Sequence, residues 1–458
     1  TNTAVIQELI EHLLQSSPKE AETNHLLQFY RERMIAIGEL KEIDRFHDFC
    51  FNLLTGETLF FIDGENRALS FGTKDWERRA IEEPTTQTVV RGPKDAFTEN
   101  IRTNTALVRR RIKSPHLWSE RFIIGKQTNT PVVIMYMNNI ARQDLIEEVR
   151  ARLNKINVDL ILESGMIEEL IEDEPFSIVP TTYITERPDT VAAGLLEGRV
   201  AILVDGTPFA IIVPTVFSQF FQVSEDYYDR FTVATFIRII RFLSLFISTG
   251  LLPLYISLIT FHHEALPTPF LNNLAEQRER VPFPALLEAI FLMFSFEVLR
   301  EAGVRMPRVI GPAISIVGGL VLGQAAVEAG FVSASVVILV AMVALTDFIV
   351  PVSAMADAVK IYRYALLFLA ASFGMYGIAI GTVLIVLQLC SLRSFGIPYL
   401  APFAPFIYAD FRDIIIRFPK WAKDTRPSLI SSDKNKIRER TDMPSPKRND
   451  RWKRMKKG

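Results

Sequence analysis

Apolar residues are distributed differently in the two halves of the chain. In the first half, four short runs rich in β-branched and aromatic residues predict strands: 59–64, 131–137, 200–206 and 208–214. The last two flank Asp205-Gly206-Thr207, which is typical of a hairpin turn. Helical patterns at 95–112 and 143–156 lie between these runs. The pattern predicts a cytosolic α/β region of two subdomains, 1–90 and 91–231, joined near Pro84 and the sequence Arg-Gly-Pro that follows it.

The second half is dominated by long apolar runs at residues 242–259, 309–327, 331–350 and 364–390. Each is close to the roughly 20 residues that cross a bilayer, and the last is long enough to tilt. Together they predict an α-helical polytopic membrane domain over residues 232–418. Two weaker segments, 284–298 with two glutamates and 395–409 with many prolines and aromatics, leave the number of crossings at four or six.

The charges are unevenly distributed, although the net charge is only -1 from 51 basic and 52 acidic residues. Residues 420–458 contain 14 Lys or Arg and 5 Asp or Glu. We therefore expect residues 419–458 to be a disordered basic tail attracted to anionic lipids. The start of the chain shows no signal-peptide pattern, and positive charge favours the cytoplasmic side. Both termini are thus expected in the cytoplasm, which requires an even number of crossings.

Patterns typical of enzymes and metal sites are absent from the sequence. Two cysteines exclude a disulfide framework and a CxxC metal site. Gly125-Lys126 lacks the earlier glycine of a phosphate loop, and His262-His263-Glu264 lacks the H-E-x-x-H spacing. The arginines at 109–111 share a helical pattern with acidic residues, so nucleic acid binding is not expected. We expect no enzymatic activity, no cofactor and no metal.

Small and polar residues in the membrane half are candidates for helix packing or for a pore. Three small residues recur at intervals of four, which allows another helix to approach closely, and Gly377 and Gly381 repeat this spacing. Polar groups at membrane depth usually face water, a partner or a cavity, although those near helix ends can reach the headgroups. The candidates are Ser315, Gly319, Gly323, Gln324, Glu328 and Asp347. Close packing alone is the alternative to a conduit.

The segment before the first apolar run is aromatic and acidic, and two arginines follow it. We expect the arginines to reach the cytoplasmic headgroups, with a role in gating as the alternative. The segment is either an interfacial anchor or a hinge that couples the α/β region to the helices. The coupling candidates are Glu225, Asp226, Tyr227, Tyr228, Asp229, Arg238 and Arg241.

Several long strings of the chain resemble the A subunit of GerA-type spore germinant receptors, over roughly residues 40–430. They are RGPKDAFTENIRTNTALVRRRI, TERPDTVAAGLLEGRVAILVDGTPF, QFFQVSEDYYDRF, PFPALLEAIFLMFSFEVLREAGVRMPRVIGPAISIVGGLVLGQAAVEAGFVS and CSLRSFGIPYLAPFAP. The A-subunit-like membrane proteins of the SpoVA system share much of this pattern.

The resemblance implies a multi-pass protein of the spore inner membrane, beside a permease-like B subunit and a lipoprotein C subunit. It implies a subunit that transduces nutrient binding into cation release, as a homo-oligomeric ligand-gated ion channel. A secondary transporter, or a scaffold that gates a separate channel, is the alternative. The sequence shows no convincing internal repeat of the kind found in transporters.

Overall fold

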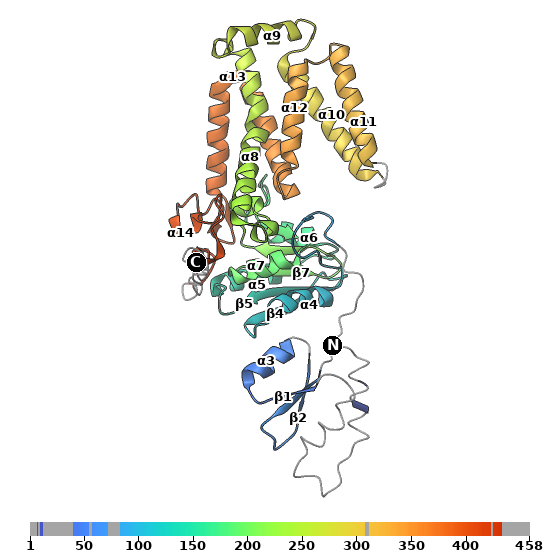
Figure 1. The fold of residues 1–458 in the computed structure, drawn as a ribbon, viewed down its shortest axis with the longest axis vertical. Helices are drawn as coiled ribbons and strands as arrows, with labels where there is room; N and C mark the ends of the chain where they lie inside the picture. Colours follow the sequence, from blue (N-terminus) through green and yellow to red (C-terminus); the bar gives the residue numbers. More distant parts are fainter. Residues whose placement is uncertain are drawn as a thin grey trace, which may run out of the picture. The chain divides into compact units, whose positions relative to one another are not determined.

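The structure is a computed structural model that describes Gln7, Ile10, Glu11 and residues 40–54, 57–71, 83–306, 311–422 and 425–432. The predicted disordered tail is ordered at its start, where Ile430 is buried and Ser431 forms a β-bridge with Ala141; from position 433 onward it lies outside the described residues. The chain forms two compact units (Figure 1). The first unit comprises Thr1–Glu172, Thr182–Pro214 and Arg426–Lys436, and the second comprises Asp173–Thr181, Thr215–Thr425 and Ile437–Gly458. The finer boundaries near 90, 231 and 418 stay predictions.

The first unit contains two sheets, and the smaller one has three antiparallel strands. Its strands β1 (Leu40–Ile43), β2 (Thr58–Phe61) and β3 (Ala68–Phe71) run in the order β1-β3-β2, and α3 (Phe46–Leu54) lies between β1 and β2 in sequence. The central strand β3 is buried along its whole length.

The larger sheet has five antiparallel strands in the order β4-β5-β7-β8-β6. Their bounds are β4 Leu117–Ile124, β5 Thr130–Met137, β6 Tyr183–Thr185, β7 Val200–Val204 and β8 Ala210–Val213. Every residue of β7 and β8 is buried, which explains why both strands are continuous apolar runs. The predicted strands and the hairpin between β7 and β8 are confirmed, with Val200 opposite Val213.

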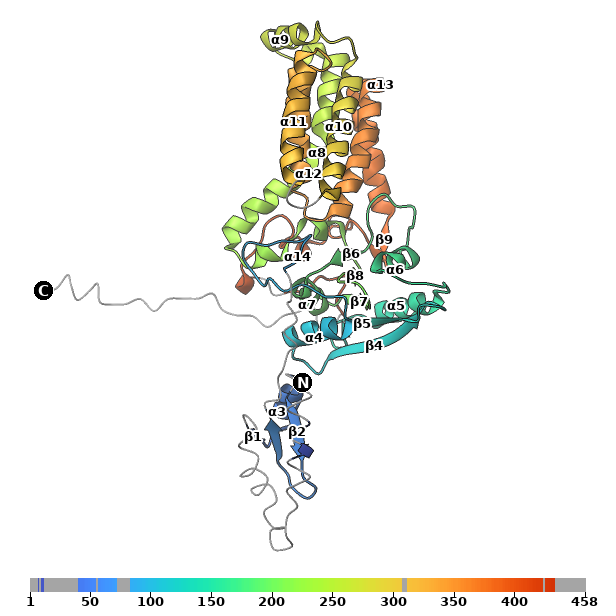
Figure 2. The ribbon, with the colours of Figure 1, turned by 90° about the vertical axis from the view of Figure 1, so that its right-hand side faces the viewer.

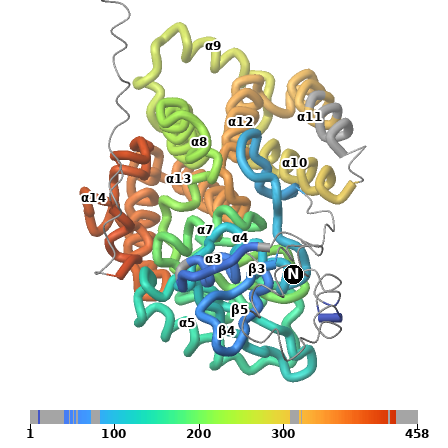
Figure 3. Tube along the Cα trace, turned by 60° about the horizontal axis from the view of Figure 1, so that its bottom comes forward, coloured from blue at the N-terminus to red at the C-terminus, as the bar shows by residue number. Residues whose placement is uncertain are grey.

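Helices cover both faces of this sheet (Figure 3). They are α4 (Ile101–Arg111), α5 (Gln143–Lys155), α6 (Ser164–Ile171) and α7 (Pro188–Leu196). Helices α4 and α7 pack together on one face, whereas α5 lies on the other with α6 beside it. Asn100 caps α4, since its side-chain oxygen accepts hydrogen bonds from the backbone N–H groups of Arg102 and Thr103.

The second unit is mainly helical. Its helices are α8 (Phe231–Thr260), α9 (Thr268–Arg278), α10 (Ala285–Arg305), α11 (Gly311–Glu328), α12 (Ala334–Asp347), α13 (Ser353–Ser391) and α14 (Tyr408–Phe411). Two 3₁₀ turns, η3 (Phe217–Phe221) and η4 (Ser224–Tyr227), precede α8, and a short hairpin, β9 (Arg393–Ser394) with β10 (Ile397–Pro398), follows α13. Helix α9 lies at one end of the bundle and α14 at the other (Figure 2).

The bundle is apolar both inside and outside. Its core includes Leu252, Val336 and Leu367, whereas large side chains such as Phe291 and Phe368 point outward and are exposed. Helices α8 and α13 are long and apolar enough to cross a membrane by length and composition, and α12 is a shorter apolar helix. An exterior of this kind is expected of helices in lipid rather than in water.

Helix α10 contains the weaker apolar segment 284–298, and both glutamates of that segment have partners within the bundle. Glu288 is 1% exposed and accepts hydrogen bonds of 2.9 Å from both the backbone nitrogen and the hydroxyl of Ser333. Glu297 forms ion pairs with Arg300 at 2.7 Å and Lys360 at 3.4 Å. Since both glutamates have polar or charged partners within the bundle, they do not prevent α10 from lying in an apolar layer.

Helix α13 is broken at Gly374, so the expectation of one long tilted helix over 364–390 is wrong. Gly374 has φ 63° and ψ -142°, a conformation that is not helical. Tyr362 donates a hydrogen bond of 3.2 Å to Gln388, 26 residues further on, whereas an unbroken helix would separate them by about 39 Å. The two segments are therefore antiparallel.

Two further glycines allow these segments to approach closely. A Cβ atom at Gly377 would lie 2.1 Å from the carbonyl oxygen of Leu369, and one at Gly381 would lie 2.6 Å from a methyl group of Leu366. The close packing predicted from their spacing is confirmed within one chain. The segment 395–409 forms the turn and second strand of the β9–β10 hairpin, a series of turns and the start of α14, rather than a crossing helix.

Glu168 on α6 is a largely buried carboxyl group in the first unit, and it accepts a hydrogen bond from the hydroxyl of Thr182. Burial is the main cause that raises the pKa of Glu168 from 4.5 to about 7. The hydrogen bond from Thr182 lowers the pKa, whereas the nearby charges of Glu172 and Glu163 raise it further. The native state therefore binds a proton that the unfolded state releases between about pH 4.5 and 7.

Glu168→Gln should stabilise the protein at pH 8 and have little effect at pH 4.5. The native site disfavours the charged carboxylate of Glu168. Above the native pKa this carboxylate is charged, so Glu168 then lowers the stability of the protein most. We expect a gain on the order of 1–3 kcal/mol at pH 8, measured as Tm by circular dichroism of the full chain in detergent. A change in Tm that is the same at both pH values would contradict the raised pKa.

Gly374→Ala should destabilise the second unit by about 1–3 kcal/mol, because its backbone conformation suits only glycine. The new Cβ would also lie 2.9 Å from the His262 ring. Thermal unfolding in one detergent measures the effect. Gly250→Ala is the matched control, since it lies in α8 with nothing within 4 Å of the added Cβ, and it should be neutral or slightly stabilising. Equal Tm values for the two variants would contradict this explanation of the break.

Candidate functional site

Buried charges gather where η4 meets the start of α8, and Asp226 is at their centre. Its carboxylate accepts hydrogen bonds from Arg238 Nε at 2.8 Å and from Arg241 Nη1 at 2.7 Å. Arg238 is 0% exposed, Asp226 3% and Arg241 8%. We call this group, with Asp413, Tyr227 and Arg417, the charge cluster.

Local structure positions these groups. The backbone nitrogen of Val223 donates to the Asp226 carboxylate at 3.3 Å, which closes the η4 turn and aims the acid toward α8. Arg238 and Arg241 are three residues apart and therefore share one face of that helix. The acid and both guanidinium groups thus meet within 15 residues of chain.

The other half of the charge cluster comes from the segment after α13. Arg238 Nη1 donates to the Asp413 carboxylate at 3.0 Å and to its backbone oxygen at 2.7 Å. The Tyr227 hydroxyl donates to the same carboxylate at 3.0 Å, and the Tyr227 ring lies 5.2 Å from the Arg238 guanidinium. Arg417 donates to the backbone oxygens of Asp229 at 2.8 Å and of Tyr227 at 3.3 Å. The charge cluster therefore joins the chain before α8 to the chain after α13.

The expectation that Arg238 and Arg241 reach the headgroups is wrong. Both are buried, because Asp226 and Asp413 provide acids at hydrogen-bond distance inside the protein. Breaking such a pair by removing one partner typically costs about 3–5 kcal/mol, since it leaves a buried charge unpaired.

The remaining coupling candidates lie around the charge cluster. The backbone oxygen of Glu225 accepts hydrogen bonds from the backbone nitrogens of Tyr228 at 2.9 Å and Asp229 at 3.1 Å. These bonds shape the turn between η4 and α8. Glu225, Tyr228 and Asp229 are half-buried.

Asp347 is paired inside the bundle rather than free. Arg363 donates to its carboxylate through two nitrogens, each at 3.0 Å, and the Ser248 hydroxyl donates to it at 2.6 Å. The three residues lie on α12, α13 and α8, and all are less than 9% exposed. Asp347 therefore connects three helices, which favours the helix-packing interpretation of this candidate over a pore.

The pore candidates on α11 are in a different environment. Gln324 donates to Glu328 at 2.8 Å, and both side chains are exposed. A Cβ at Gly319 would meet no atom of the described residues within 4 Å, whereas one at Gly323 would lie 3.8 Å from Val337 on α12. The side chain of Ser315 lies outside the described residues. Of the predicted small-residue face, Gly319 is thus open and Gly323 is in contact.

Four residues of these sites were not predicted from the sequence: Ser248, Arg363, Asp413 and Arg417. Arg363 could have been noticed, since it directly precedes the run at 364–390 and needs an acidic partner. Asp413 and Arg417 carry no comparable signal, because their partners are more than 170 residues away in sequence.

The charge cluster is better suited to holding segments of the chain together than to catalysis. Every acid of the charge cluster is bonded to an arginine or a tyrosine. Among the described residues, no group of three or more His, Cys, Asp or Glu side chains could hold a metal ion.

Comparisons with known proteins agree on one family. The family described as Bacillus/Clostridium GerA spore germination protein matches residues 1–429. Spore germination protein KA of Bacillus subtilis (strain 168) is 46% identical over 97% of this chain and 81% of its own length. The uncharacterized membrane protein YfkQ of the same strain is 45% identical over 83% of this chain and 74% of its own length. Spore germination protein GerLA of Bacillus cereus is 37% identical over 90% of this chain and 84% of its own length.

A solved structure is also similar in sequence. It is the N-terminal domain of the A subunit of the Bacillus megaterium spore germinant receptor GerK3. The two sequences are 42% identical, and the match covers 46% of this chain and 78% of that chain, with a TM-score of 0.36. Given the family match and the relatives, this chain belongs to the GerA family of spore germination proteins.

Proposed function

We propose that this chain is the A subunit of a nutrient germinant receptor, and that several copies enclose a gated cation conduit in the spore inner membrane. A permease-like B subunit and a lipoprotein C subunit would be its partners. Support comes from the family, whose members are named for spore germination, and from the apolar exterior of the bundle. The polar pair on the outside of α11 favours a conduit.

The proposed topology has six crossings with both termini in the cytoplasm. The crossings are α8, α10, α11, α12 and the two segments of α13 on either side of Gly374. The charge cluster supports an even number, because Asp413 after the last crossing bonds to Arg238 at the start of the first. Both ends of the bundle must then lie on one side of the membrane.

The exposed pair Gln324–Glu328 is the observation that carries the conduit proposal. A polar amide and a carboxylate on the outside of an apolar helix would be costly against lipid. The pair is tolerated where water or another protein surface faces it. Copies packed about a closed axis through this face of α11 would enclose the pair.

Asp347 is left out of the proposed conduit, because Arg363 and Ser248 already satisfy it inside the bundle. We assign the charge cluster to coupling instead. It binds the segment that enters the membrane to the segment that leaves it, so a displacement of η4 would move α8 and the chain around Asp413 together.

Gln324→Leu should reduce cation flux at least tenfold in liposomes that contain the purified full chain and its partner subunits. Native mass spectrometry in a gentle membrane mimic should show a discrete ring of several copies. Thr382→Val is the matched control, since Thr382 is an exposed polar residue on α13 whose hydroxyl, among the described residues, bonds to its own helix at Ile378. A strict monomer, or flux unaffected by Gln324→Leu, would favour a scaffold or transporter instead.

Asp226→Asn should slow nutrient-induced germination at least tenfold in spores that carry the variant as their only copy. The amide removes the charged partner of Arg241 and leaves Arg238 paired with Asp413 alone, so the connection between η4 and α8 is weakened. Immunoblots of spore membranes separate this effect from loss of the protein. Glu301→Gln, which removes an exposed acid from α10, should germinate normally. Normal germination of Asp226→Asn at normal protein level would refute the coupling role.

A further inference from the structure

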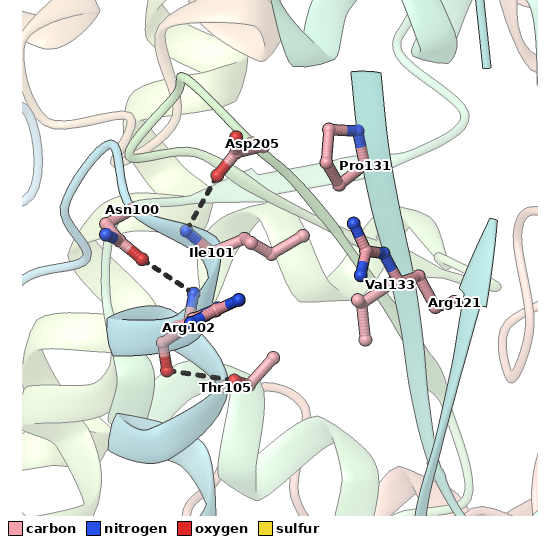
Figure 4. A pocket seen from close by; sticks show the side chains of 8 residues that line it. All are labelled: Asn100, Ile101, Arg102, Thr105, Arg121, Pro131, Val133 and Asp205. Atoms are coloured by element: carbon pink, nitrogen blue, oxygen red, sulfur yellow. Dashed lines mark hydrogen bonds between the residues drawn. The ribbon is translucent and has the colours of Figure 1, made fainter. Parts of the chain in front are cut away.

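A cavity of about 400 Å³ opens on the first unit, between the start of α4 and the strands β4 and β5 (Figure 4). Its walls include Ile101, Arg102, Arg121, Val133 and Asp205. The volume lies within the range of small-molecule sites, which is about 300–1,000 Å³. None of these residues belongs to the machinery proposed above.

Two arginines reach into this cavity from different elements. Arg102 extends from α4 and Arg121 from β4, and both guanidinium groups point toward the same hollow (Figure 4). Within the part of the chain that the structure describes, neither guanidinium has a hydrogen bond or an ion pair. Two positive charges that converge on one hollow repel each other, so an anion between them would be stabilising.

The acids near Arg121 are already engaged. Glu120 precedes it on β4 and therefore points to the opposite face of the sheet. There Glu120 accepts a hydrogen bond of 2.8 Å from Arg150 Nε. Asp205 does line the cavity, and one of its oxygens accepts a hydrogen bond of 3.0 Å from the backbone nitrogen of Ile101. One acid thus faces two arginines, and the hollow keeps a positive charge.

The start of α4 does not itself provide the binding groups. Its first backbone N–H groups are capped, since Asp205 accepts from Ile101 and Asn100 accepts from Arg102 at 2.9 Å. The donors that remain are those of the two guanidinium groups. Guanidinium groups match the planar oxygens of carboxylates and the oxygens of phosphates.

We infer that this cavity binds a small organic anion through Arg102 and Arg121, with a carboxylate or phosphate as the recognised group. The side chains of Ile101 and Val133 provide an apolar wall for the carbon part of the ligand. Val133 lies directly opposite Arg121 in the β4–β5 ladder, so the apolar and charged parts of the site are held together by the sheet. The inference does not depend on the conduit, because binding can be measured without any ion flux.

The test uses the full chain in phosphatidylcholine nanodiscs, with equilibrium dialysis against radiolabelled succinate and, separately, inorganic phosphate. We expect saturable binding of at least one probe, with one site per chain, that weakens as chloride is raised. Arg102→Gln and Arg121→Gln should each weaken binding about 10- to 100-fold, in line with the loss of a charge-assisted hydrogen bond. Comparing the two probes distinguishes a carboxylate from a phosphate site.

Arg110→Gln is the matched control, because it removes the same charge from the exposed side of α4 without lining the cavity; it should bind as the parent does. Circular dichroism checks that each variant is folded. Absence of saturable binding by both probes would overturn the inference, and so would unchanged binding in both Arg102→Gln and Arg121→Gln. If phosphatidylglycerol nanodiscs abolish probe binding, a lipid headgroup occupies the site and the soluble anion is refuted.

Discussion

The carboxylate of Asp226 allows two arginines to be buried at the end of an apolar helix. Without an acid at hydrogen-bond distance, each guanidinium would have to remain in contact with water or headgroups. The pairing with Arg238 and Arg241 therefore fixes where η4 lies against α8. Asp413 extends this constraint to the chain that follows α13. The two ends of the bundle are thus joined by electrostatics rather than by apolar packing alone.

Charged groups in the interior of the bundle also need partners at hydrogen-bond distance. Glu288 accepts hydrogen bonds from Ser333, Glu297 pairs with two cations and Asp347 pairs with Arg363, so these three acids have partners within the bundle. Gln324 and Glu328 are different, because they are polar and exposed on α11. Their exposure distinguishes them from Glu288 and Asp347, which are buried and have partners inside the bundle.

Arginine side chains lie in two different environments on the larger sheet of the first unit. On one face of the larger sheet, Arg150 is bonded to Glu120 and Tyr136, and this holds the pKa of Glu120 below its usual value. On the other face, Arg102 and Arg121 have no such partner among the described residues. Where an arginine is paired, it contributes to the fold; where two converge without pairing, they are available to a ligand. This contrast within one sheet is the basis of the proposed anion site.

Local patterns in the sequence were sufficient for the α/β first unit, the strands at 131–137 and 200–214, and the apolar helices, because periodicity reflects which face of an element is buried. They could not identify the partners of Arg238 or Asp347, since these pairs join residues up to 175 positions apart. The break at Gly374 was equally invisible, because glycine is tolerated in long helices. Only the packing of the folded-back segment against Leu366 and Leu369 makes it necessary. Burial follows from residue type and spacing, whereas charge pairing and chain reversal depend on which elements meet in space.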